Sequence, residues 1–310
     1  MQNPLAGRDL VSISDVTKEE IQLVLKCAED MRKRPRPALL KGKILASCFF
    51  EPSTRTRLSF ETAMLRLGGA NIGFADGGIT SARKGETLFD AMKVIGSYAD
   101  LIVLRHPQEG SARLAAEAAG IPVINAGDGA NQHPTQTLID LFTIRECQGK
   151  IEDLHIALVG DLKYGRTIHS LSLALSHAPV RLYFVAPESL HLPDSITHEL
   201  KKKGVKFSFH EKLEEVVPKV DVLYMSRIQK ERFPEMAEGF ANPCRLKMSH
   251  LEKAKSTLKI LHPLPRVDEI EGAIDATPFA YYHQQAAHGV VVRMALLALI
   301  LDQLDLSQDP

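Results

Sequence analysis

The sequence has no excess of charge of either sign, since 38 lysines and arginines balance 38 aspartates and glutamates. It therefore offers neither the basic surface that binds nucleic acid nor an acidic tail, and we expect no nucleic-acid partner. An anionic ligand must be held by a local cluster of basic side chains, because the molecule as a whole has almost no net field.

Cysteine is scarce, and its placement excludes two further classes of protein. The four cysteines are Cys27, Cys48, Cys147 and Cys244. None belongs to a C-x-x-C pair and their spacing matches no zinc pattern, so we predict no metal site. A disulfide framework is not expected in so long a chain with so few cysteines, which favours reduced thiols and a cytoplasmic location.

Long hydrophobic runs are also missing. The longest, residues 294–301, is far shorter than the ~20 residues that span a bilayer. The first ten residues lack the apolar stretch of a signal peptide. We therefore expect no membrane partner.

Apolar runs of strand length alternate with helical patterns along the chain. Thr17 and Glu20 have the spacing of a capping box that opens a first helix. Strands are predicted at residues 44–50, 71–75, 101–104, 122–125, 155–159, 181–185, 205–209, 222–225 and 258–261. Helical patterns fall between them, which is typical of βαβ units. We predict an α/β fold with two domains, each a parallel sheet with helices on both faces.

A polar break at residues 149–153 separates two series of strands and helices. It predicts a first domain over 1–149 and a second over 150–285, in line with the ~150 residues of a usual domain. The last helical pattern, 286–304, is expected to pack back on the first domain. We expect the active site in the cleft between the domains.

Residues 53–57 read Ser-Thr-Arg-Thr-Arg, directly after a predicted strand and at the start of a predicted helix. A helix N-terminus offers free N–H groups and a partial positive charge. Hydroxyl and guanidinium groups at that end are typical of a phosphate-binding site. The alternative is a capped helix whose arginines face solvent.

Residues 160–167, Gly-Asp-Leu-Lys-Tyr-Gly-Arg-Thr, imitate the nucleotide-binding P-loop. Arg166 stands where that motif has lysine, and no clear Walker B strand follows, so nucleotide binding is the weaker interpretation. Arg166 at the carboxyl end of a strand is still well placed to bind an anion.

Other basic and polar residues follow predicted strands. Arg105 follows 101–104, Arg227 and Gln229 follow 222–225, and His262 follows 258–261, while His133 precedes a helix. Each alone is unremarkable, but parallel strands would bring them to one cleft. No nucleophile–base pair or cofactor fingerprint stands out. The pattern favours a site that positions a polyanionic substrate and stabilises developing charge.

These motifs resemble those of the aspartate/ornithine transcarbamoylases, over essentially the whole chain. Residues 53–57 and 133–136 resemble the two carbamoyl phosphate motifs of that family. Residues 227–232 and 262–266 resemble the aspartate-specific versions of two others. The His-Cys-Leu-Pro and Ser-Met-Gly motifs expected of an ornithine enzyme are absent.

The resemblance implies transfer of a carbamoyl group from carbamoyl phosphate to the amine of L-aspartate. The products are N-carbamoyl-L-aspartate and phosphate, in the committed step of de novo pyrimidine biosynthesis, and no cofactor takes part. The residues implied to bind carbamoyl phosphate are Ser53, Thr54, Arg55, Thr56, Ser81, Lys84, Arg105, His133 and Gln136. Those implied to bind aspartate are Lys84, Arg166, Arg227, Gln229, Leu264 and Pro265. Arg105, His133, Thr56 and Lys84 are implied to be catalytic.

Residues 80–86 resemble a loop that reaches the neighbouring subunit's site, although they read one residue shorter than the familiar version. The resemblance thus implies a homotrimer with shared active sites, and some relatives bind separate regulatory chains. Glu51, Glu231 and Arg232 resemble residues that exchange ion pairs when the domains close, or are static surface pairs. Two alternatives stay open: a transcarbamoylase acting on ornithine, and a non-catalytic phosphometabolite-binding protein on the same fold.

Overall fold

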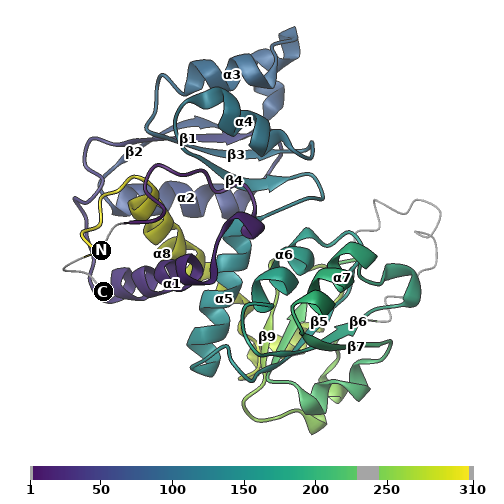
Figure 1. The fold of residues 1–310 in the computed structure, drawn as a ribbon. Helices are drawn as coiled ribbons and strands as arrows, with labels where there is room; N and C mark the ends of the chain where they lie inside the picture. The colour runs from purple at the N-terminus through teal and green to yellow at the C-terminus, as the bar shows by residue number, and fades with distance from the viewer. Residues whose placement is uncertain (1–2, 229–243, 307–310) are drawn as a thin grey trace. The chain divides into compact units, whose positions relative to one another are not determined.

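The computed structural model describes residues 3–228 and 244–306. The chain forms two compact units, Met1–Ile139 with Ala287–Pro310 (unit 1) and Asp140–Ala286 (unit 2). Each unit contains one sheet in which every strand pair is parallel. The predicted fold class, two α/β domains with parallel sheets, is confirmed (Figure 1).

The sheet of unit 1 has the strand order β2-β1-β3-β4. Its strands are β1 (Ile44–Phe49), β2 (Ala70–Phe74), β3 (Leu101–His106) and β4 (Val123–Asp128). The helices are α1 (Lys18–Lys33), α2 (Thr54–Arg66), α3 (Leu88–Ile95), α4 (Ser111–Ala119), α5 (Pro134–Gln148) and α8 (Tyr282–Ile300). Figure 1 shows α3 and α4 on one side of this sheet and α2 on the other. The division into units falls inside α5 and inside α8.

Local sequence explains where the elements of unit 1 begin and pack. The Thr17–Glu20 capping box is present at α1, as predicted. Ala46 and Cys48 of β1 pack against small residues of α4 such as Ala115. The whole run 101–104 is buried, as a parallel strand covered on both faces requires.

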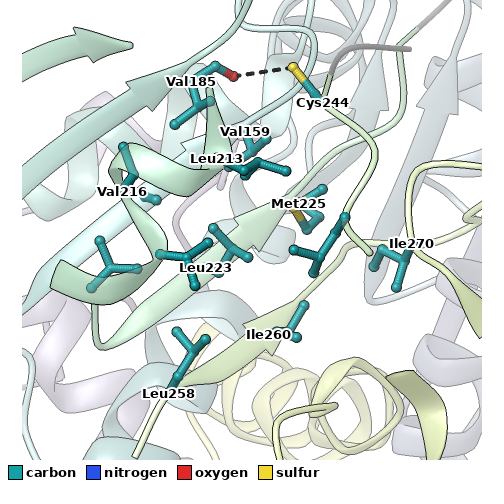
Figure 2. Packing of buried hydrophobic residues seen from close by; sticks show 14 of the residues in the cluster. Val159, Val185, Leu213, Val216, Leu223, Met225, Cys244, Leu258, Ile260 and Ile270 are labelled. Carbon is teal, nitrogen blue, oxygen red and sulfur yellow. Dashed lines mark hydrogen bonds between the residues drawn. The ribbon is translucent and has the colours of Figure 1, made fainter. Parts of the chain in front are cut away.

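The sheet of unit 2 has the order β7-β6-β5-β8-β9. Its strands are β5 (His155–Val159), β6 (Arg181–Val185), β7 (Lys206–His210), β8 (Val222–Met225) and β9 (Lys259–Leu261). Helices α6 (Arg166–Leu175) and α7 (Asp194–Lys202) follow β5 and β6. Figure 2 shows a core cluster in which Val159, Leu223 and Met225 pack together, while the Cys244 thiol donates to the Val185 carbonyl at 3.7 Å.

Most predicted strand boundaries move by two residues or fewer, and two elements move further. The predicted strand 122–125 continues to Asp128, because this segment stays fully buried through the Gly127 turn. The last helix, predicted at 286–304, spans Tyr282–Ile300, since Tyr282 is already buried in the core of unit 2. No disulfide joins the four cysteines, all of which lie within the described residues. No helix in the described ranges is both long and apolar enough to cross a membrane.

Candidate active site

The start of α2 forms the centre of the predicted phosphate site in unit 1. Ser53 is the N-cap residue with an extended backbone, and its side chain makes no capping hydrogen bond. The hydroxyl and the first N–H groups of α2 can therefore donate to an anion. Thr54 and Arg55 are exposed, whereas Thr56 is 8% exposed. The predicted cradle thus combines donors that reach solvent with one that is fixed in the protein.

The two arginines of this motif differ in their surroundings. Arg57 Nη1 lies 3.3 Å from Glu61 Oε1, one helical turn further on. Arg55 makes no ion pair with any residue in the described part of the chain. Although Arg55 is exposed as a whole residue, partial burial of its guanidinium group lowers its pKa from the ordinary value. Arg55 is therefore the arginine left to bind an anion, while Arg57 fits the alternative of a surface pair.

Arg105 lies beside this motif because β1 and β3 are neighbours. Its carbonyl accepts the Phe50 N–H at 2.8 Å, and its Nη2 lies 2.7 Å from Glu51 Oε1. Burial lowers the pKa of Arg105, the Glu51 carboxylate raises it, and repulsion from Arg55 lowers it again. Its buried Nε has no hydrogen-bond partner. Since the charges of Arg55 and Arg105 repel each other, an anion between them would be stabilised.

His133 follows a loop that a buried carboxylate organises. Asp128, 1% exposed, accepts hydrogen bonds from Asn125, Asn131, Gln132 and Gly110 at 2.8–3.1 Å. His133 is 5% exposed and its Nδ1 lies 3.5 Å from the Thr135 hydroxyl. Sequence reasoning missed Asp128, although the glycines on either side of it were a signal for a tight turn.

Ser81 and Lys84 lie on an exposed 3₁₀ turn, Ser81–Lys84, which Thr80 caps and Gly85 ends with φ 91°. Within the described ranges, neither side chain forms a hydrogen bond or ion pair with residues 53–57. Ser81 lines a hollow of about 630 Å³ together with Phe50, Phe74 and other residues of unit 1. The fold of one chain thus presents this turn at the surface.

In unit 2, Arg166 is the first residue of α6. The loop before it contains two glycines at positions where a side chain would clash with neighbouring backbone. Gly160 has φ 113°, and a Cβ there would lie 2.3 Å from the Ser226 carbonyl oxygen. A Cβ on Gly165 would lie 2.2 Å from the Asp161 carbonyl oxygen. The close approach of backbone to backbone therefore explains both glycines of the P-loop-like motif without a nucleotide.

Two more loops follow β8, which is next to β5, and β9, which is next to β8. Val159 of β5 pairs with Met225 of β8, so Arg227 follows the strand beside the one that leads to Arg166. Both arginines are partly exposed. The predicted residues Gln229, Glu231 and Arg232 lie outside the described residues. The carboxyl ends of β5, β8 and β9 thus share one edge of the sheet.

The loop after β9 carries Leu264 and Pro265, joined by a cis peptide bond. Arg266 is held elsewhere: it pairs with Asp275, and its Nη1 donates to the Tyr282 hydroxyl at 2.8 Å. The Arg266 hydrogen bond holds the pKa of Asp275 down at about 2. In this motif, Arg266 is therefore held by structural contacts away from Leu264.

Comparisons with known proteins match both units. The model for the carbamoyl-P binding domain of aspartate/ornithine carbamoyltransferase matches residues 8–146, and the model for the Asp/Orn binding domain matches 152–300. The aspartate carbamoyltransferase catalytic subunit of Vibrio campbellii is 55% identical over 307 residues, covering 98% of this chain and 99% of its own. That of Chromobacterium violaceum is 56% identical over 297 residues, with coverages of 96% and 98%.

Solved structures agree with these relatives. The catalytic subunit of M. jannaschii aspartate transcarbamoylase has a TM-score of 0.88 at 51% identity, covering 95% of this chain and 98% of its own. The Trypanosoma cruzi aspartate transcarbamoylase with carbamoyl phosphate and aspartate bound has a TM-score of 0.90 at 36% identity, with coverages of 96% and 97%. The chain therefore belongs to the aspartate/ornithine carbamoyltransferase family.

Proposed function

We propose that this chain transfers the carbamoyl group of carbamoyl phosphate to the amine of L-aspartate, giving N-carbamoyl-L-aspartate and phosphate. The observation that carries the proposal is a pair of neighbouring arginines, Arg55 at the start of α2 and Arg105 on β3: Arg55 has no ion pair in the described chain, and its charge acts on Arg105, whose side chain is 15% exposed. Such a pair suits a dianionic phosphate. The relatives are named aspartate carbamoyltransferase, and this name supports L-aspartate as the acceptor of the carbamoyl group.

In unit 1, we assign Ser53, Thr54, Arg55 and Thr56 to the phosphate. Arg105, His133 and Thr56 surround the carbonyl oxygen of the carbamoyl group, and Gln136 faces its amine. Thr56 and His133 are buried and the side chain of Arg105 is only 15% exposed, which supports this assignment, because donors shielded from water stabilise a developing oxyanion more strongly than donors in water.

The chemistry follows from these groups. The neutral amine of aspartate attacks the carbamoyl carbon, the C–O bond to phosphate breaks, and the leaving phosphate accepts the amine proton. Negative charge grows on the carbonyl oxygen beside Arg105. Glu51 holds Arg105 at 2.7 Å, so substrate binding exchanges one anionic partner of Arg105 for another. No covalent enzyme intermediate and no cofactor are needed.

In unit 2, we assign Arg166, Arg227 and Gln229 to the carboxylates of aspartate, with Leu264 and Pro265 lining the site. Two guanidinium groups match two carboxylates, and charge-assisted hydrogen bonds hold each one. The cationic side chain of ornithine would be repelled by the same arginines, which favours aspartate over the ornithine alternative.

We further propose that the active unit is a homotrimer in which Ser81 and Lys84 of one chain complete the site of its neighbour. Lys84 is exposed and makes no ion pair with the described residues, as a residue that acts on another subunit requires. Most exposed large apolar side chains of the described chain also belong to unit 1, typical of an association surface: Leu58, Leu65, Ile72, Ile79, Phe89, Val94, Tyr98 and Leu114.

We further propose that the reaction belongs to de novo pyrimidine biosynthesis and that the chain acts in the cytoplasm. Separate regulatory chains are a further partner that the family allows. If the catalytic trimer is active by itself, such chains would only regulate its activity.

The test is product formation by the purified chain with carbamoyl phosphate and either L-aspartate or L-ornithine, with no added metal or nucleotide. We expect carbamoyl aspartate and phosphate in equal amounts, and no product from ornithine. Carbamoylation of ornithine, or binding of carbamoyl phosphate without turnover of either amine, would overturn the proposal in favour of one of its two alternatives.

A further inference from the structure

A chain of buried hydrogen bonds runs through unit 2 beneath the candidate aspartate site. The Tyr224 hydroxyl donates to Asp140 Oδ2 at 2.9 Å, and Gln285 Nε2 donates to Asp140 Oδ1 at 2.7 Å. Gln285 Oε1 accepts the N–H of His262 at 2.7 Å. These four residues are at most 2% exposed, so water cannot replace any of these bonds.

The chemistry of the partners requires an amide at position 285. Each oxygen of Asp140 accepts a hydrogen bond here, and a backbone N–H such as that of His262 only donates. A carboxamide offers one donor and one acceptor group at the same side-chain end, so its orientation is fixed by these two partners. A methionine or leucine of similar size would remove one hydrogen bond from each of these two buried partners.

The same network fixes the loop that carries Leu264. His262 Nδ1 accepts the Leu264 N–H at 2.8 Å, so its Nε2 carries the ring proton and donates to Glu269 Oε1 at 2.6 Å. Glu269 Oε2 in turn accepts the N–H groups of Val267 and Asp268 at 2.9 and 3.0 Å. Residues 262–269 therefore form one internally bonded loop, which Gln285 attaches to the rest of unit 2.

Leu264 needs this support. Its φ is 56°, in the left-handed region that a bulky side chain rarely adopts. Such a conformation persists only where the surrounding structure enforces it. Its own N–H is bound to His262, whose N–H is bound to Gln285.

The other two strand ends contact the same network. Tyr224 lies on β8, three residues before Arg227, and its hydroxyl also bonds to the side chain of Thr167, next to Arg166. The loops that carry Arg166, Arg227 and Leu264 thus meet at buried groups that contact no substrate themselves. Neither the family motifs nor the spacing of charged residues identifies Asp140, Tyr224 or Gln285.

We propose that Gln285 is a positioning residue for aspartate. Through Asp140 and His262, it fixes the relative positions of the three loops that carry Arg166, Arg227 and Leu264. The inference rests on the proposed function. It assigns Gln285 to the recognition of one substrate only, because its bonds lie entirely within unit 2.

The test compares Gln285→Met with Gln148→Met. Gln148 also joins backbone of unit 2, donating to the carbonyl of Asp221 at 2.9 Å in a partly buried position and to that of Thr257 at 3.0 Å at the surface, but no bond links it to residues 262–269. Both substitutions should lower the melting temperature. Only Gln285→Met should raise KM for aspartate, by about tenfold, while KM for carbamoyl phosphate changes less than about twofold.

Equal changes of both KM values in Gln285→Met, or an unchanged KM for aspartate, would overturn the inference. If Gln285→Met does not fold, Tyr224→Phe removes a single hydroxyl and should raise KM for aspartate about threefold; an unchanged value overturns the inference equally. The wild-type chain in the same assay separates the two claims. An inactive wild type refutes the proposed function. An active wild type, with variants whose KM for aspartate is unchanged, refutes only the role of Gln285.

Discussion

The two units build their halves of the candidate site in different ways. In unit 1, most of the groups come from consecutive residues at one helix start, Ser53 to Thr56, with Arg105 on the adjacent strand and His133 before α5. In unit 2, Arg166, Arg227 and Leu264 follow three different strands, and a buried network joins the loops that carry them. The first half depends on a local motif, and the second depends on contacts between distant parts of the sequence.

The difference has a consequence for single substitutions. A change in unit 1 should act directly on the group that binds the anion, because few buried residues stand between the motif and the ligand. A change in unit 2 should also act at a distance, since the loops share Asp140, Tyr224 and Gln285. Substitutions that compare a ligand-binding residue with a matched neighbour therefore test this division.

The largest effect is expected within the local motif, from Arg55→Ala compared with Arg57→Ala. Arg55→Ala removes a cation that stabilises the leaving phosphate, so kcat/KM should fall about 100-fold or more. Arg57 pairs with Glu61 on the helix surface, and such pairs contribute about 0.5 kcal/mol, so Arg57→Ala should stay within about twofold. Equal losses in steady-state assays of the two variants would remove the distinction between them.

The next effect concerns unit 2, and in particular the stability of its loop 262–269 in acid. Burial alone would raise the pKa of Glu269, but hydrogen bonds from His262 and the Val267 N–H outweigh it and lower the pKa from 4.5 to about 2. Since the folded pKa is depressed, the stabilisation is complete above about pH 4.5 and is lost as the pH falls towards 2. Over this range, the wild type should lose about 3 kcal/mol more unfolding free energy than Glu269→Gln.

Urea unfolding at several pH values measures this difference. Asp275→Asn is a matched control, because Arg266 also lowers the pKa of Asp275 to about 2, yet this carboxylate is exposed. Salt should weaken the contribution of Asp275 and leave that of Glu269 nearly unchanged. If Glu269→Gln follows the wild-type pH dependence, the buried His262–Glu269 pair does not stabilise the loop.

A smaller signal is expected from mixed trimers of Lys84→Ala and Arg55→Ala, each inactive alone. In a random mixture, three quarters of the trimers contain both chains, and each has one intact site in three if neighbours share sites. Activity should therefore recover to about a quarter of the wild-type value. Mixtures that stay inactive after subunit exchange is demonstrated would show that Lys84 serves its own chain or neither.

The division also explains what sequence alone could predict. Residues 53–57 could be identified because the strand, the helix start and the charged groups are contiguous. The parallel sheets followed from alternating apolar runs such as 101–104. Asp128, Tyr224 and Gln285 could not be identified, because one sequence does not show which polar residues meet in the interior. The separate surroundings of Arg55 and Arg57 likewise depend on Glu61, a partner that the motif does not specify.

The most direct test of the account is a crossed measurement of KM for both substrates in Ser53→Ala and Arg227→Ala. Ser53 belongs to the motif at the start of α2 in unit 1. Its loss should therefore raise KM for carbamoyl phosphate and leave KM for aspartate within about twofold. Arg227→Ala should do the reverse, raising KM for aspartate about tenfold or more, as the loss of a charge-assisted hydrogen bond predicts. If each variant changes both KM values equally, the assignment of one substrate to each unit is wrong.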